Sequence, residues 1–541
     1  MGRVKRRLIV LAALAVLTVP SGRAASEVVK VLGAGSPEMW QAAAIGAYQL
    51  AGSGAQHYTV SGTCTAGANC AQIHDSRSTS ILNEGGSLWV VWTSEMTQIW
   101  AYISVDSLVG TRAYFAAPRA TLQADPLTET VGGVPPGQTN LISSNLWGLD
   151  ATALPVAVYT ALNNAAVTAA FTDILPPDAK AANCRVLNQL NPVTYAGLGY
   201  GTGTTCTTLI GTQILSAFSS TGANPVNFNI KGTDPFSGDP IAAYTTLNVG
   251  ASPVLFLVNR TNPNGLGYGG PGTPVITDLS VHNAQKIFNG DECDTNAFGA
   301  AGSPADVPVI PMLREPLSGT MDVTELTTFR CGGSPCAITG STNKDNSQEV
   351  GVNPRLHLNN PLDLSCVSGG GKRQRAIGTT EMVGTAIKNT ADSVGYAFFS
   401  YGNVAQIAGS PNYGYLTQNG IDPIQATYTD GQLPVCVSST GESGVCPAVP
   451  GTSFPNLRNG TCTAWSLLRV VTDTSGASMT NAKSLVTAIQ DIVNATVPDF
   501  VPYNAVGGDP GMKYYRSHFS DGGDVGGCIE PVGSTVLNCH Q

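Results

Sequence analysis

Arg314-Glu-Pro-Leu-Ser-Gly-Thr320 directly follows the apolar run Val307-Pro-Val-Ile-Pro-Met-Leu313. An apolar run of this length predicts a buried strand that ends at the arginine. After the turn, Val323, Leu326 and Phe329 recur at i, i+3 and i+6, which is the spacing of one face of a helix. The stretch therefore predicts a strand, an arginine, a short turn and a helix.

The residues of this turn suit a tetrahedral anion. The first N–H groups of a helix have no partner within the helix, and the helix dipole is positive at that end. Gly319 lets an oxyanion approach the backbone closely, and Ser318 and Thr320 add hydroxyl donors. Arg314 adds a planar fork of N–H groups that matches phosphate. The alternative is an ordinary capped surface helix, preceded by an arginine that forms a surface ion pair with a neighbouring glutamate.

The N-terminal segment predicts export. Residues 1–24 combine a basic start, an apolar core from Leu8 to Val19, and the small-residue cleavage site Gly22-Arg-Ala24. This arrangement is typical of a secretory signal peptide, and its apolar core is too short to span a bilayer comfortably. We therefore expect a mature protein in the periplasm or outside the cell, without a membrane anchor.

Composition and charge narrow the class of protein. Charged residues make up only 12% of the chain and hydrophobic residues 42%, with 62 Gly and 34 Pro. A hydrophobic content of this size can fill a core, so the chain reads as a loop-rich exported protein. Removing the signal leaves 22 basic and 36 acidic side chains, a formal charge of −14. This charge argues against nucleic acid and anionic membranes as partners.

The thirteen cysteines all follow the signal segment, and in an oxidising compartment they indicate disulfides. Because the count is odd, at least one thiol is free or pairs between chains. No C-x-x-C motif is present, and the six histidines are scattered, so the sequence predicts no metal site and no cofactor. The locally spaced candidate pairs are Cys64/Cys70, Cys184/Cys206, Cys331/Cys336, Cys436/Cys446 and Cys528/Cys539.

Strands and helices alternate along the chain, which predicts an α/β fold with a mainly parallel sheet. Ligands of such sheets lie at the carboxyl ends of the strands. The strand-end loops to examine are Gly35-Ser36, Ser61–Thr63, Thr172-Asp173 and Arg314–Thr320. The predicted strands are Val28–Leu32, His57–Val60, Leu88–Trp92, Trp100–Val105, Ser252–Asn259 and Ser393–Phe399.

Three helical stretches accompany these strands, and one long segment is predicted to be a loop. An alanine-rich stretch from Leu154 to Phe171 is predicted to be helical, and a helix over Ser280–Phe288 is closed by Gly290. The clearest amphipathic pattern, from Ala482 to Val493, predicts a further helix. Residues 331–378 are rich in Gly, Ser and Asn and are predicted to form a loop insertion.

The order of these elements resembles the phosphate-binding component of bacterial phosphate ABC transporters, a class II periplasmic binding protein family. The resemblance covers most of the mature chain, and its most specific part is R-x-x-x-S-G-T. The matching stretches are Gly33-Ala-Gly-Ser36, Lys286-Ile-Phe-Asn-Gly290, Arg314-x-x-x-Ser318-Gly-Thr320 and Ser393-Val-Gly-Tyr396.

The resemblance implies two lobes with phosphate held between them. Residues 25–250 and 395–541 would form lobe 1, and residues 251–394 would form lobe 2 with the insertion 331–378. It implies phosphate ligands at Ser36, Asp173, Arg314, Ser318, Gly319 and Thr320.

The resemblance also implies an aspartate that accepts the proton of HPO4²⁻, because an unprotonated anion beside a carboxylate is a costly buried contact. Asp173 is the candidate for this role, because it follows the predicted helix at a place where the family's third strand-end loop should lie. Asp106 is its competitor, because it ends the predicted strand Trp100–Val105. The sequence departs from the family at Pro316, where an acidic residue is common, and in the long segments 64–150 and 331–378.

The expected function is therefore capture of inorganic phosphate for the membrane permease of an ABC transporter, without enzymatic activity. Two alternatives on the same fold are a surface or secreted interaction protein and a protein that binds another oxyanion. A secreted phosphatase or esterase is a third class. No G-x-S-x-G motif or metal cluster supports that class.

Overall fold

The structure is a computed structural model. It describes residues 28–60, 71–74, 84–116, 118–123, 149–150, 154–179, 243–267, 276–298, 307–314, 318–329, 364–366, 371–376, 378–428, 431–435, 451–495, 499–517, 524–525 and 527–533. The predicted signal peptide, the loop Ser61–Thr63 and four of the five candidate cysteine pairs lie outside these residues. Cys528 is disulfide-bonded, and its predicted partner Cys539 also lies outside them.

Most of the strands belong to one large mixed sheet. Their bounds are β1 Val28–Gly35, β2 Gln56–Val60, β3 Ala71–His74, β4 Glu84–Trp92, β5 Gln98–Ser104, β6 Thr121–Gln123, β7 Leu149–Asp150, β8 Ala169–Thr172, β9 Tyr244–Asn259, β10 Ile310–Arg314, β11 Leu364–Ser365, β12 Lys372–Ala376, β13 Ser393–Phe398, β14 Tyr413–Leu416, β15 Trp465–Asp473, β16 Val501–Pro502, β17 Tyr514–Arg516 and β18 Ile529–Pro531. The order across the sheet is β11-β12-β10-β13-β9-β15-β8-β1-β5-β4-β2-β7, and β17 and β18 form a separate pair.

The helices are mostly short. Their bounds are α1 Trp40–Ala51, α2 Ser107–Phe115, α4 Val156–Leu162, α8 Val281–Asn289, α9 Gly319–Thr324, α10 Gly378–Glu381, α11 Tyr401–Val404, α12 Pro455–Arg458 and α13 Gly476–Ala495, with single turns η1 Pro37–Met39 and η2 Thr295–Phe298 and π-helical turns η3 Glu325–Phe329 and η4 Met382–Ile387. Within the described residues, no helix has both the length and the apolar composition needed to cross a bilayer.

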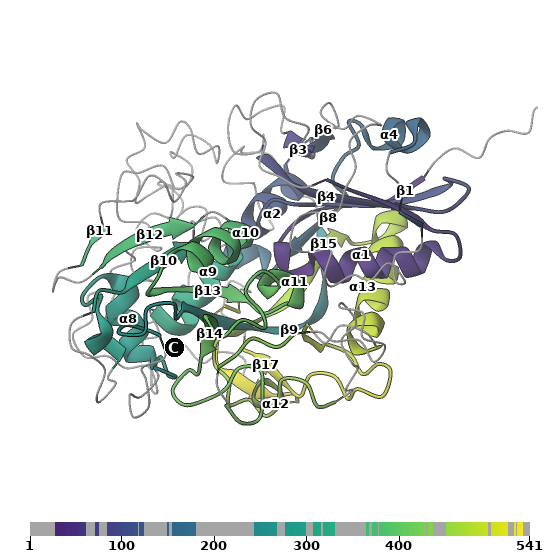
Figure 1. The fold of residues 1–541 in the computed structure, drawn as a ribbon. Coiled ribbons are helices and arrows are strands. Elements are labelled where there is room, and N and C mark those ends of the chain that lie inside the picture. The colour runs from purple at the N-terminus through teal and green to yellow at the C-terminus, as the bar shows by residue number, and fades with distance from the viewer. Residues whose placement is uncertain are drawn as a thin grey trace, which may run out of the picture.

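The sheet divides into two halves about the long strand β9. Residues Tyr244–Pro253 of β9 pair with β15, and residues Val254–Val258 pair with β13. Figure 1 shows β10, β12, β13 and α8 on one side of the molecule, and β1, β4, α1 and α13 on the other. The α/β class is confirmed, and the sheet has the two halves that a two-lobe fold requires. β14 lies in the range 395–541 that was predicted for lobe 1. It nevertheless pairs with the same part of β9 as β13 does.

The first half of the sheet, which contains β1, β4, β5 and β8, is covered by helices on both faces. The second half contains β10, β12 and β13. Val31 packs with α1 and α13, whereas its neighbour Leu32 packs with α2 on the opposite face, as the two-residue period of a strand requires. The helices α1 and α13 approach closely, because a Cβ added at Gly46 would lie 3.1 Å from the side chain of Ile489. This packing holds β1 rigidly between two apolar layers.

The sheet is mixed, so the prediction of a mainly parallel sheet is wrong. β1 is parallel to β5 and to β8, and β10 is parallel to β12 and to β13. However, β4 is antiparallel to β2 and β5, and β9 is antiparallel to β13, β14, β15 and β16. A parallel pair needs a crossover, whereas β4 and β5 are joined by a short turn.

Two local predictions are also corrected. The helix expected over Leu154–Phe171 ends at Leu162 as α4, and β8 begins at Ala169. Asn164 has φ 63°, and this left-handed turn ends the helix. Within the predicted loop 331–378, Lys372–Ala376 form β12, which pairs with β10.

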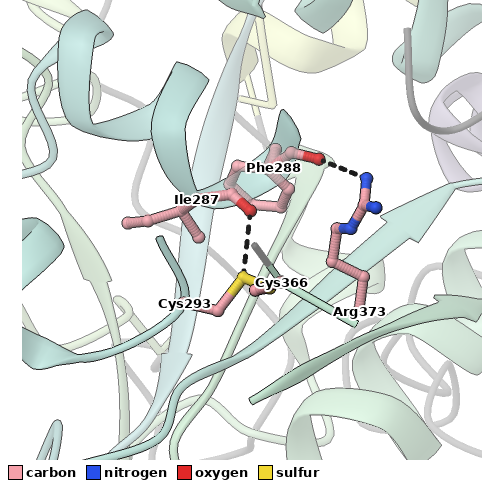
Figure 2. The surroundings of a disulfide bond; sticks show 5 residues. All are labelled: Ile287, Phe288, Cys293, Cys366 and Arg373. Atoms are coloured by element: carbon pink, nitrogen blue, oxygen red, sulfur yellow. Dashed lines mark hydrogen bonds between the residues drawn. A yellow bond between two sulfur atoms is a disulfide. The ribbon is translucent and has the colours of Figure 1, made fainter. Parts of the chain in front are cut away.

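The second half contains the described disulfide bond, Cys293–Cys366 (Figure 2). Cys293 follows α8, a helix that begins at the cap Ser280 and ends at Gly290 with φ 79°, as the sequence predicts. The bond joins residues 73 positions apart, and the chain-entropy model gives such a cross-link about 4 kcal/mol of stabilisation. Beside it, Arg373 donates a hydrogen bond of 3.4 Å to the carbonyl of Phe288. Together these contacts fasten the end of α8 to β11 and β12.

Cys462 is a free thiol and is buried. Burial is the main cause that raises the pKa of this thiol to about 12. A thiol with such a pKa stays protonated, so Cys462 is unreactive.

Candidate functional site

Three neighbouring parallel strands of the first half end at the same edge of the sheet. The order is β8-β1-β5. Asp173 and Ser36 directly follow β8 and β1, and Asp106 lies two residues after the end of β5. Parallel strands present their carboxyl ends together, so these side chains gather in one place. Gly35 allows this close packing, because a Cβ at that position would lie 1.9 Å from the carbonyl oxygen of Phe171.

The second half contributes the ends of β10 and β12 to the same place. Arg314 is the last residue of β10, and its side chain is completely buried. Its Nη2 donates to Asp106 Oδ1 at 3.0 Å, and its Nη1 donates to Thr379 Oγ1 at 2.9 Å. Its backbone N–H donates to Tyr396 OH at 3.0 Å. Arg314 therefore spans the two halves, and its complete burial excludes the alternative of a surface arginine.

Asp106 adopts an unusual backbone conformation in this pair. Its φ is 71° and its ψ is 155°, a combination that costs a residue with a side chain about 1–3 kcal/mol. Its carboxylate is 10% exposed in the pair with Arg314. Such strain persists where the surrounding structure holds it, and it concentrates at functional sites.

Gly319 brings the start of α9 against the first half. A Cβ added to Gly319 would lie 2.6 Å from Ser107 Oγ and 2.7 Å from Asp173 Oδ2. Any side chain here would collide with both residues, so only glycine permits this approach. The predicted residues Asp173 and Gly319, 146 positions apart in the chain, are thus immediate neighbours.

Asp173 is a buried acid at the centre of this contact. Its side chain is 1% exposed, and its Oδ1 is buried without a hydrogen-bond partner among the described residues. Burial raises the pKa of this carboxyl to about 6, while hydrogen bonds from Ser36 and Ser107 and the charge of Arg314 oppose the rise. Because the folded-state pKa lies above the ordinary value, ionising Asp173 costs stability as the pH rises through about 6.

The predicted hydroxyl donors lie at the same site. Ser36 Oγ accepts from the N–H of Glu38 at 3.2 Å, and Ser318 Oγ accepts from the N–H of Met321 at 3.3 Å. A hydroxyl that accepts in this way can still donate its own proton, as Ser36 does to Asp173. Thr320 is 1% exposed. The structure thus brings Ser36, Asp173, Arg314 and Gly319 together, with Ser318 and Thr320 buried on either side of Gly319. Their role as ligands stays a prediction.

Sequence reasoning missed two residues of this site, Glu38 and Thr379. Ser107 fits the family's serine-rich second loop only loosely, as Ser61–Thr63 does, and the structure places Ser107 at the site. Thr379 follows β12, which was hidden in the predicted loop 331–378. Glu38 is in the first ligand loop, but its role depends on partners 341 and 365 residues away.

In the described ranges, no group of three or more His, Cys, Asp or Glu side chains is arranged to hold a metal ion.

Comparisons with known proteins identify structural neighbours only. No protein-family model matches the chain, and no relative was found among curated proteins. A high-affinity periplasmic phosphate-binding protein (PfluDING) bound with phosphate is 13% identical, with a TM-score of 0.33, over 86% of this chain and 90% of its own. A phosphate-binding protein from Stenotrophomonas maltophilia is 12% identical (TM-score 0.30; 63% of this chain and 78% of its own).

A third neighbour is PstS from Borrelia burgdorferi, which is 14% identical (TM-score 0.24; 46% of this chain and 69% of its own). With TM-scores below 0.5, these likenesses carry no argument about the ligand. The assignment of the fold rests on the strand order described above.

Proposed function

We propose that this protein is an exported solute-binding protein that captures inorganic phosphate between the two halves of its sheet. The observation that carries the proposal is the position of Arg314. Its buried guanidinium reaches from β10 of one half to Asp106 of the other, beside Asp173 and Gly319.

The chemistry of these groups favours a tetrahedral oxyanion. The guanidinium supplies parallel N–H donors and the charge that a buried anion requires. The hydroxyl of Thr379 accepts from the guanidinium at 2.9 Å, and the hydroxyls of Ser36 and Ser107 are hydrogen-bonded to Asp173. With a pKa of about 6, Asp173 is mostly ionised near neutral pH and can accept the proton of an anion that carries one. A fully ionised anion beside this carboxylate would be a buried like-charge contact. Phosphate carries such a proton near neutral pH, whereas sulfate does not.

Delivery follows from the predicted export. A signal peptide over residues 1–24 would place the protein in the periplasm or outside the cell, where the permease of an ABC transporter would receive the phosphate. Binding would close the two halves by a hinge, and β9 is the strand that both halves share.

The test is isothermal titration of the purified, phosphate-stripped mature protein with phosphate and then with sulfate. We expect tight one-to-one binding of phosphate and no heat with sulfate. Binding of a different oxyanion in the same titration would keep the site and change the ligand. Absence of heat with every oxyanion would contradict the proposal and favour an interaction protein on the same fold.

Replacing Asp173 with Asn should relax the discrimination against sulfate. The amide carries no negative charge to repel a fully ionised anion. We therefore expect sulfate affinity to rise roughly 10- to 100-fold, which corresponds to the free-energy cost of one buried unpaired polar contact. Competition of sulfate against bound phosphate measures this change.

Asp106→Asn is the comparison variant, because Asp106 is the other candidate acid and pairs directly with Arg314. If Asp173→Asn still rejects sulfate fully while Asp106→Asn accepts it, Asp106 is the proton acceptor.

A further inference from the structure

Glu38 is a buried acid that connects the loop after β1, which contains Ser36, to the second half of the structure. It lies two residues after Ser36, in η1, and is 3% exposed. Its Oε1 accepts from Thr379 Oγ1 at 3.4 Å, and its Oε2 accepts from Asn403 Nδ2. Thr379 Oγ1 in turn accepts from Arg314 at 2.9 Å. The carboxyl of Glu38 is therefore one hydroxyl away from the guanidinium of the site.

Glu38 faces one negative and one positive charge. Asp173 at the end of β8 and Arg314 at the end of β10 both act on it, and Tyr102 of β5 is close enough to respond to its charge. Thr379 and Asn403, from α10 and α11, do not titrate. Arg314 is already paired with Asp106. An ionised Glu38 would therefore add a negative charge beside an anion that the same guanidinium has to balance.

We propose that Glu38 is a third acid of the binding site, that it is held there as a neutral carboxylic acid, and that capture of phosphate requires its proton. When Glu38 is protonated, its Oε1 donates to Thr379 Oγ1 across the same distance instead of accepting from it. The proposal deepens the proposed function and rests on it. It assigns to this chain a proton-dependent capture that Arg314 and the two aspartates do not by themselves explain.

The electrostatics of Glu38 agree with this geometry. Burial is the main cause that raises its pKa well above the ordinary value, and the charge of Asp173 raises it further, against the opposing effects of Arg314, Asn403 and Thr379. For an acid with a raised folded-state pKa, the stabilisation is complete at low pH and is lost as the pH rises through that pKa. An anion bound nearby would raise the pKa again, so binding would take up a proton.

The experiment is phosphate titration of the wild type and Glu38→Gln from mildly acidic to alkaline pH. The amide reproduces the shape and neutrality of the protonated acid. Taking the ratio of the two affinities at each pH cancels the titration of phosphate itself. We expect equal affinities at acidic pH, and above the pKa of Glu38 we expect the variant to bind more tightly by about tenfold per pH unit.

Asp499→Asn is the matched control. Asp499 is also a buried acid, with its pKa raised by burial to about 7, and it accepts from the N–H of Tyr401 at 2.8 Å in the same helix as Asn403. The ratio of wild-type affinity to that of Asp499→Asn should not change with pH. If Glu38→Gln does not fold, the proton uptake of the wild type is measured instead, by titration in buffers of different ionisation enthalpy.

The outcomes separate this proposal from the proposed function. Phosphate binding with a wild-type to Glu38→Gln ratio that is constant with pH would overturn the role of Glu38 and leave phosphate capture standing. In the fallback measurement, no proton uptake beyond that of phosphate would do the same. Absence of phosphate binding by the wild type at every pH would overturn both.

Discussion

Arg314→Ala is expected to remove most of the phosphate affinity, by about 3–5 kcal/mol, which corresponds to about two to four orders of magnitude in Kd. Arg314 is completely buried and is the cation that directly contacts Asp106 and Thr379. Without it, both the anion and Asp106 would be buried uncompensated. Isothermal titration with phosphate measures the loss. Arg314→Lys should recover only part of it, because an ammonium lacks the planar fork.

Arg458→Ala is the control for this prediction. Arg458 forms another buried pair, donating to Asp509 at 2.8 Å, and the contacts described for the site do not include it. This variant should lose stability but bind phosphate normally. Unchanged phosphate affinity in Arg314→Ala would show that the site is elsewhere.

Arg469→Met is expected to lower the free energy of unfolding by about 3–5 kcal/mol, because it leaves a buried carboxylate without its partner. Arg469 and Asp524 are each 1% exposed and form an ion pair. Arg469 Nη1 also donates to the carbonyls of Asp173 at 3.3 Å and Leu467 at 2.8 Å. Arg469 therefore links this ion pair to the backbone of Asp173. Chemical denaturation measures the loss of stability.

A double-mutant cycle tests this interpretation. Replacing both partners, as Arg469→Met with Asp524→Leu, removes the unpaired charge, so the double variant should be more stable than the sum of the single effects predicts. Additive effects would mean that the two side chains are energetically independent. Phosphate titration of the double variant then shows whether the backbone of Asp173 has moved.

Arg314 contacts both halves of the sheet because the strands of the two halves end at the same place. The carboxyl ends of β8, β1 and β5 place Asp173, Ser36 and Asp106 at one edge, and β10 delivers Arg314 to the same edge from the other half. The order of the strands therefore brings these residues together, and each residue lies at or near the end of a packed strand.

The local patterns of the sequence predicted the elements well where one pattern dominates. Ser280 and Gly290 are capping signals that act within a few residues, and α8 begins and ends at them. The helix predicted around Ala482–Val493 forms as α13, because an apolar stripe of that length has one way to be buried. Turn chemistry was missed at Asn164, where a short αL turn divides α4 from β8.

The sequence by itself determined the short-range parts of this protein: the strand that ends at Arg314, the capped helices and the loop with Gly35 and Ser36. Their causes are steric and local, so a few neighbouring residues suffice to specify them. The mixed sheet, the Cys293–Cys366 bond and the position of Glu38 at the site could be seen only in the three-dimensional structure. These depend on which distant segments pack together, because hydrophobic burial and hydrogen bonding act between surfaces regardless of their separation along the chain.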